Sequence, residues 1–237
     1  LYNPKTCKFS YCPYKFIKNC IFFNIQCNVK ILIDLINRGI FMNNKTLKIA
    51  TIGLMAALAY VSFTFLQIKI PTPGGTTSFH LGNTFCVLAA LLLGGLPGGI
   101  AGAIGMGIGD LLDPVYVTYA PKTIILKLMI GIVTGLVAHK IFKIEKHDND
   151  SHLIIYVVIS CMAGMFFNVV GEPIFGYFYN SMILGAPEKA AATLASWNAI
   201  TTSVNAVITV ALASTIYLVI RPRLAGSGIL VKLAPHK

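Results

Sequence analysis

Long apolar segments alternate with short polar connections along the chain from Met42 onward. A helix needs about 20 mainly apolar residues to cross a bilayer, and most of these segments approach or exceed that length. The six segments that we expect to cross a membrane as helices are Leu47–Leu66, Leu81–Leu93, Gly98–Leu112, Thr123–Phe142, Leu153–Tyr179 and Pro187–Ile220. The pattern therefore predicts an all-α integral membrane protein, built as a six-transmembrane-helix bundle.

The second and third segments are short, and the run Gly94–Gly99 separates them. They form either a tight helical hairpin or one kinked helix. With the hairpin, the basic loop at residues 140–146 lies on the same side as the basic residues at both ends of the membrane domain. Basic residues concentrate on the cytoplasmic side of membrane proteins. We therefore expect the hairpin, in a multi-pass protein of the cell membrane with N- and C-termini cytoplasmic.

Two segments of different composition flank the membrane domain, which we expect to span residues 42–223. Residues 1–41 mix Lys, Asn, Cys and Phe without clean periodicity. We expect them to form an N-terminal extension that is either poorly ordered or translated upstream of a natural start at Met42. The alternative is an amphipathic surface helix around Phe16–Ile40, with its apolar face at a lipid interface. Residues 224–237 are expected to form a cytoplasmic C-terminal tail.

The composition agrees with a membrane protein. Hydrophobic residues make up 56% of the chain and charged residues only 11%, whereas a soluble domain carries about 25% charged residues. The net charge of +11 could suggest nucleic-acid binding, but the basic residues lie at the ends of apolar segments rather than in a stripe with interleaved aromatic residues. The six cysteines include no C-x-x-C pair and match no zinc framework. We expect no metal site and no cofactor.

Two glycine patterns resemble enzyme signatures but lack the parts that the chemistry requires. Gly107–Asp110 fits the G-x-G-D signature of intramembrane aspartyl proteases, but no upstream transmembrane aspartate provides the second carboxylate. The glycines between Gly98 and Gly109 follow no strand, as a dinucleotide fingerprint requires, and are better explained by close helix packing. No G-x-x-x-x-G-K-[ST] motif occurs, so the chain cannot hydrolyse ATP by that route.

A connection rich in proline and glycine joins the first two predicted helices. The segment Gln67–Phe79 holds two prolines and two glycines between residues 71 and 75, which end helices and form turns. We expect an ordered loop on the extracellular side. His80 and Asn83 follow at its mouth, where His80 either caps the next helix or contacts a ligand.

Three ionisable residues stand alone within apolar segments: Asp110, Lys127 and Glu172. A charge inside the bilayer is costly unless it faces a partner or a protein-lined cavity. These residues therefore indicate an interior site. We expect Lys127 to pair with Asp110 or Glu172, although a direct contact with a ligand is equally consistent with its position.

Polar residues form stripes on the last two predicted helices. Asn168 and Glu172 share one face of the fifth helix, and Asn198 and Thr202 belong to a matching stripe on the sixth. Such stripes can be structural contacts between helices, but nearby aromatic residues favour a pocket for a flat polar ring. The candidate substrate-binding residues are His80, Asn83, Tyr116, Tyr119, Lys127, Asn168, Glu172, Tyr179, Trp197, Asn198 and Thr202.

These features together resemble a known family, the substrate-binding S components of energy-coupling factor (ECF) vitamin transporters. The resemblance covers about Met42 to Arg223. It rests on the alanine-rich first span, the Pro/Gly loop, the run Thr77–Asn83 leading to Leu91–Gly95, and Gly109-Asp110 before a tyrosine-containing loop and Lys127.

The resemblance implies a six-helix bundle that captures a vitamin at its extracellular side. It also implies association with a transmembrane T component and two cytoplasmic ATPases, in a transporter and not an enzyme. In the family, small residues of the first span contact the T component. Carried over to this chain, they are Gly53, Ala56 and Ala57.

An aromatic pocket with amide and carboxylate groups suits a small nitrogen heterocycle with hydroxyl groups. The resemblance is closest to members assigned to pyridoxine or hydroxymethylpyrimidine, with riboflavin next. Two other classes stay open. One is an integral-membrane enzyme that uses Asp110, His80 and Glu172, and the other is a structural membrane subunit.

Overall fold

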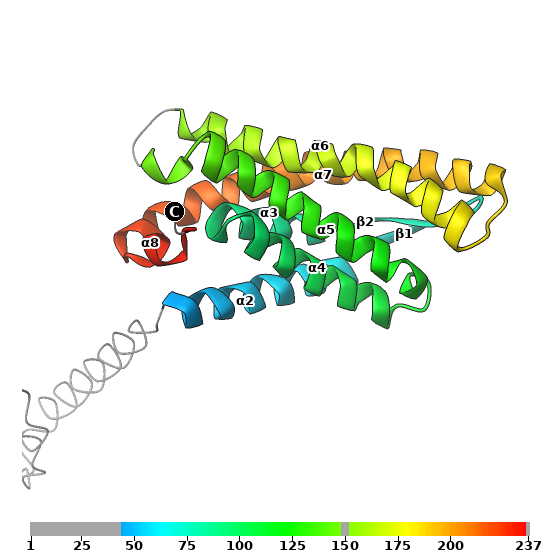
Figure 1. Cartoon of the computed structure of the whole chain (residues 1–237), viewed down its shortest axis with the longest axis horizontal. Coiled ribbons are helices and arrows are strands. Elements are labelled where there is room, and N and C mark those ends of the chain that lie inside the picture. Colours follow the sequence, from blue (N-terminus) through cyan, green and yellow to red (C-terminus); the bar gives the residue numbers. More distant parts are fainter. Residues whose placement is uncertain (1–43, 148–151, 236–237) are drawn as a thin grey trace, which may run out of the picture. The chain divides into compact units, whose positions relative to one another are not determined.

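The computed structural model describes residues 44–147 and 152–235. These residues form one helical bundle with a small β-hairpin (Figure 1). The N-terminal extension at residues 1–41 and the alternative surface helix around Phe16–Ile40 lie outside the described residues.

Six apolar helices make up the bundle. They are α2 (Asn44–Thr64), α3 (Gly82–Leu93), α4 (Gly95–Leu112), α5 (Ala120–Gly135), α6 (Leu153–Phe178) and α7 (Glu188–Gly226). Short π-helical segments extend two of them, η3 (Leu136–Ile141) after α5 and η5 (Tyr179–Ile183) after α6. Among the described residues, five helices, counted with these extensions, are long and apolar enough to cross a membrane. The helical membrane bundle predicted from the apolar pattern is confirmed.

Helix α3 is the exception in length, since it has only 12 residues. Nearly all of them are buried, and α3 contacts α2, α4, α5 and α7. A helix that is hydrophobic on all sides is expected where protein surrounds it. The short second segment is therefore a buried core helix, against which the longer helices pack.

Helices α3 and α4 form the tight hairpin that the charge pattern favoured. Gly94, with φ of +95°, makes the turn between them. A Cβ atom on Gly98 would collide with Ala90, and one on Gly102 would collide with Cys86, so the two helices run antiparallel at close range. Glycines farther along α4 approach α2 just as closely. The glycine pattern therefore serves helix packing, as predicted.

The segment expected to be a loop contains a β-hairpin, which corrects the prediction for Gln67–Phe79. Strand β1 (Ile68–Thr72) pairs antiparallel with β2 (Gly75–Phe79). The prolines and glycines were interpreted as helix ends and turns of an ordered loop. The flanking Ile and Thr residues favour strands, and Gly74, with φ of +105°, lies in the turn. The hairpin packs on α7 through a hydrogen bond between the hydroxyls of Thr77 and Thr201.

The C-terminal residues fold back onto the bundle. Helix α7 continues to Gly226, and α8 (Ile229–Leu233) follows it. The Lys48 ammonium donates a hydrogen bond to the carbonyl of Ala234, and the Arg221 guanidinium donates to the carbonyl of Ile144, at the start of the short helix η4 (Ile144–Lys146). Basic residues from both ends of the domain and from the loop after α5 thus share one end of the bundle. The cytoplasmic location of that end remains a prediction.

Candidate functional site

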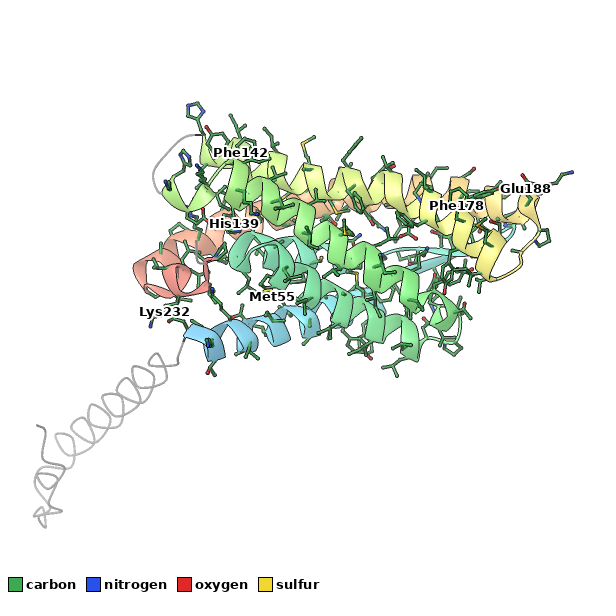
Figure 2. All side chains as sticks on the ribbon, viewed as in Figure 1. Met55, His139, Phe142, Phe178, Glu188 and Lys232 are labelled. Atoms are coloured by element: carbon green, nitrogen blue, oxygen red, sulfur yellow. The ribbon has the colours of Figure 1, made fainter. Side chains whose placement is uncertain are left out.

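A polar cavity lies in the half of the bundle that carries the β-hairpin, opposite the basic end. Figure 2 labels Phe178 and Glu188 at this end, and His139 and Lys232 at the other. Every helix from α2 to α7 contributes to the cavity, and β2 contributes three consecutive residues. The cavity offers about 80 Å³ to the centres of water molecules. At roughly 10–15 Å³ for each water, this is room for about six of them.

Nine of the eleven residues predicted to bind substrate line this one cavity. They are His80, Asn83, Tyr116, Tyr119, Lys127, Asn168, Glu172, Asn198 and Thr202. The first of them, His80, and the last, Thr202, are more than 120 residues apart in the chain. The packing of the helices brings all nine together. Their role in binding stays a prediction.

Tyr179 and Trp197 do not line the cavity. The Tyr179 hydroxyl donates a hydrogen bond of 2.6 Å to the carbonyl of Thr118, so it links η5 to the segment before α5. Trp197 is 39% exposed. Consecutive residues of a helix point in directions about 100° apart. Asn198 therefore lines the cavity, while its neighbour Trp197 points away from it.

The strongest interaction in the cavity is an ion pair that the sequence did not predict. The Lys122 ammonium lies 2.5 Å from a carboxylate oxygen of Glu172, and both side chains are largely buried. Lys122 directly precedes the predicted fourth helix, Thr123–Phe142, and was not among the candidate substrate-binding residues. Glu172 was the signal that could have found it, since a buried carboxylate requires a cationic partner.

Lys127 does not form the expected ion pair with Asp110 or Glu172, which is a correction. Among the described residues, no carboxylate lies within 4.0 Å of its ammonium. The ammonium donates instead to Oδ1 of Asn168, at 3.4 Å. Lys127 is 5% exposed and Asp110 is 2% exposed. The cavity wall therefore holds a buried cation and a buried anion that are not bonded to each other.

The polar atoms in the wall that have no hydrogen-bond partner among the described residues include Nδ1 of His80 and Oδ1 of Asn83. Burial, reinforced by the charge of Lys127, lowers the pKa of His80 to about 3, so its ring is neutral at physiological pH. Buried polar atoms are nearly always satisfied by protein or ordered water. Unsatisfied atoms that line a cavity are free to bond with a small molecule inside it.

Aromatic residues form another part of the wall. The rings of Phe63 and His80 pack edge-to-face, with 4.8 Å between their centroids. Tyr116 follows α4, and Tyr119 ends the short helix η2 (Val117–Tyr119). The Tyr119 hydroxyl donates to Oδ1 of Asn180, and burial raises the pKa of Tyr116 to about 12, so Tyr116 stays neutral.

An exposed ion pair connects the β-hairpin to the connection after α4. The Lys69 ammonium on β1 lies 2.5 Å from a carboxylate oxygen of Asp113. Burial opposes ionisation of Asp113, but hydrogen bonds from Lys69 and from the backbone N–H of Val115 hold the pKa of this carboxyl below its ordinary value. The pair therefore attaches the hairpin to the bundle beside the cavity.

Several residues of the cavity wall were not among the predicted site residues. They are Phe63, Thr76, Thr77, Ser78, Asp110, Lys122, Thr123, Leu194, Thr201 and Asn205. Asn205 lies three residues after Thr202 on α7. Its side chain accepts a hydrogen bond from the backbone N–H of His80 and donates one to the carbonyl of Ser78. The β2 residues gave no signal, because their contribution depends on the unpredicted hairpin.

The residues predicted to dock a partner differ in their exposure. Gly53 and Ala57 are exposed on α2, and a Cβ atom on Gly53 would meet no atom within 4 Å. Ala56 is 7% exposed, and its carbonyl packs against Gly105 of α4. Ala56 thus lies inside the bundle rather than on a docking surface.

Among the described residues, no cluster of His, Cys, Asp and Glu could hold a metal ion.

Comparison with protein families gives a match over residues 43–222 to the family described as "ECF-type riboflavin transporter, S component". The match covers most of the chain, and the chain belongs to this family. It is a multi-pass protein of the cell membrane, as predicted.

One curated relative is the "Uncharacterized protein in gap 3'region" of Pyrococcus woesei, which is 31% identical over 75 residues. Those residues are 32% of this chain and 49% of the relative, so the chain spans about half the length of the curated relative it matches. No solved structure matches the chain.

Proposed function

We propose that this S component captures a small, water-soluble nitrogen heterocycle with hydroxyl groups and delivers it for import. The observation that carries the proposal is the convergence of nine predicted residues on one cavity, together with polar atoms there that lack protein partners. Pockets of this kind bind with aromatic walls and orient the ligand with a few polar groups.

The charges in the wall favour a ligand without net charge. Lys122 and Glu172 neutralise each other, and Lys127 and Asp110 add one further charge of each sign. A ring with an ionised hydroxyl and a protonated nitrogen complements this arrangement. Lys127 then donates to the hydroxyl oxygen, and Asp110 accepts from the ring nitrogen.

The size of the cavity favours a ligand with one ring. About 80 Å³ for water centres suits pyridoxine or hydroxymethylpyrimidine after small side-chain movements. Riboflavin is the second candidate, since the family description names it. Its three-ring system requires the hairpin or the neighbouring helices to move outward.

Transport requires energy that this chain does not supply, since it carries no phosphate-binding loop motif. We propose that it associates with a transmembrane T component and two ATPases, as the family does. The exposed small residues Gly53 and Ala57 leave a smooth strip on α2. Such strips allow helices to approach closely in lipid.

The test is calorimetric titration of the full chain, purified in detergent, with pyridoxine, hydroxymethylpyrimidine and riboflavin in turn. We expect saturable 1:1 binding of a one-ring compound with no chemical change of the ligand. Glu172→Gln and Asn198→Ala are both expected to weaken it. Ser196→Ala is the matched control, because Ser196 is exposed on the same helix and bonds only its own backbone turn.

Three outcomes separate the alternatives. Unchanged affinity in both cavity variants would remove the proposed pocket. Conversion of the ligand, seen by mass spectrometry of the reaction mixture, would favour the enzyme that uses Asp110, His80 and Glu172. Absence of binding to all three compounds, in a folded protein, would favour the structural subunit.

A further inference from the structure

A second hollow lies at the opposite, basic end of the bundle. It is a groove between the α3–α4 turn, the end of α5 with η3, and the residues after α8. It offers about 870 Å³ to the centres of water molecules, roughly ten times the space of the polar cavity. Figure 2 labels His139 of the groove at this end of the bundle.

The centre of the groove is apolar. Its wall includes Leu96, Ile132 and Leu136, and Leu96 is 58% exposed. Gly95 and Gly135 lie in close contact in the same wall. Because glycine has no side chain, nothing projects from these two positions into the groove. The space between the larger residues is therefore open to a flexible hydrocarbon chain.

The rim of the groove is basic. Lys140, Lys143 and Lys146 are exposed there, and no ion pair to any of them is found in the described parts of the chain. Among the described residues, the wall has one carboxylate, that of Glu145, and it pairs with the ring of His139. Within that part of the chain, the three ammonium groups are therefore available to an external anion.

A groove lined by apolar side chains and by three lysine ammonium groups matches the chemistry of an anionic phospholipid. One acyl chain would lie along the groove, and the phosphate would contact the lysines. Basic pockets between transmembrane helices bind anionic headgroups in this way. Lys48 and Arg221 lie at the same end of the bundle, where the positive-inside rule places the anionic cytoplasmic leaflet.

We propose that the groove is a binding site for one anionic phospholipid, with the acyl chain against Leu96 and Leu136 and the headgroup phosphate on Lys140, Lys143 and Lys146. The proposal does not depend on the ligand of the polar cavity.

Native mass spectrometry of the full chain in detergent tests the proposal, with phosphatidylglycerol and phosphatidylcholine of identical acyl chains added at equal concentration. We expect one retained phosphatidylglycerol, preferred about tenfold or more over phosphatidylcholine. The triple variant Lys140→Gln, Lys143→Gln, Lys146→Gln should abolish the preference. Lys189→Gln, an exposed lysine at the far end, should keep it.

A second variant separates the acyl-chain contact from the headgroup contact. Leu136→Trp, which narrows the groove without changing charge, should reduce retention of both lipids. Glycerol phosphate without acyl chains distinguishes a lipid site from a free-phosphate site, and we expect it not to compete. Equal retention of the two lipids, an undiminished preference in the triple variant, or full competition by glycerol phosphate would each overturn the proposal. Thermal unfolding of every variant verifies that it is folded.

Discussion

Replacing Lys127 by methionine tests the most specific feature of the polar cavity. The ammonium has three donor hydrogens, and among the described residues its one hydrogen-bond acceptor is Asn168 Oδ1 at 3.4 Å, which is a long hydrogen bond. At least one donor is therefore available to a ligand. A hydrogen bond to a charged group contributes about 1.5–3 kcal/mol, and each 1.4 kcal/mol is about a tenfold change in Kd. We expect Lys127→Met to weaken binding by roughly 10- to 100-fold.

The fold should survive this change. Methionine has a length similar to that of lysine, and replacing an ammonium that is buried without an ion-pair partner removes the cost of burying that charge. Thermal unfolding of the variant should therefore occur at or above the temperature of the wild-type chain.

Calorimetry measures the affinity, and the fluorescence of Trp197 gives a second readout. It is the one tryptophan of the chain and lies next to Asn198 without lining the cavity. Lys189→Met removes an exposed lysine and should leave Kd unchanged. If Lys127→Met bound the one-ring ligand within twofold of the wild-type Kd, the assignment of Lys127 as a ligand donor would be refuted.

Three further predictions concern stability. Lys122→Met leaves Glu172 buried without the partner that lies 2.5 Å away. The variant should lower the free energy of unfolding by about 3–5 kcal/mol, measured by chemical unfolding in detergent. Adding Glu172→Gln should restore much of that loss. Gly131→Ala places a methyl group against the backbone of α4 and should lower Tm, at a cost of about 1–3 kcal/mol, whereas Gly53→Ala, with open space around it, should not. Because the pKa of Asp113 is lowered in the folded state, its exposed pair with Lys69 should stabilise the chain by at most about 1 kcal/mol at neutral pH. The Tm difference from Asp113→Asn should begin to shrink as pH falls below about 4, the ordinary range of this carboxyl, and should vanish below its lowered folded-state pKa.

Each of these predictions has a clear contradiction. An additive double variant of Lys122 and Glu172 would mean that the two groups do not interact. Equal Tm values for the two glycine variants would contradict the close packing of α4 and α5. A Tm difference for Asp113→Asn that does not shrink at all as pH falls below about 4 would assign the effect to something other than the carboxylate charge.

The sequence predicted the helices well because the apolar pattern reports directly on burial in lipid or protein. The short segment at Leu81–Leu93 could be assigned to a hairpin because charge placement distinguished the two topologies. Its position at the core of the bundle could not be predicted, since a helix surrounded by protein and one surrounded by lipid have the same composition.

The site was predictable where polar residues stand out against an apolar background, as with Asn168 and Asn198. It was not predictable at Lys122, because a lysine next to a helix start normally lies in water. Here an ion pair with Glu172, 50 residues later in the chain, holds it in the cavity. The contribution of β2 was missed because the hairpin forms within a segment whose prolines and glycines suggest an irregular loop.

Identification of the small molecule that copurifies with the chain in mild detergent tests most directly whether the polar cavity captures a ligand. Native mass spectrometry, followed by release and fragmentation, makes the identification. We expect one bound one-ring nitrogen heterocycle per chain, retained by Lys189→Met and lost from Lys127→Met. A wild-type chain that carries no such compound, and binds none when it is supplied, would contradict the claim that the polar cavity is a capture site. Retention of the same ligand by Lys127→Met at wild-type level would contradict its proposed geometry.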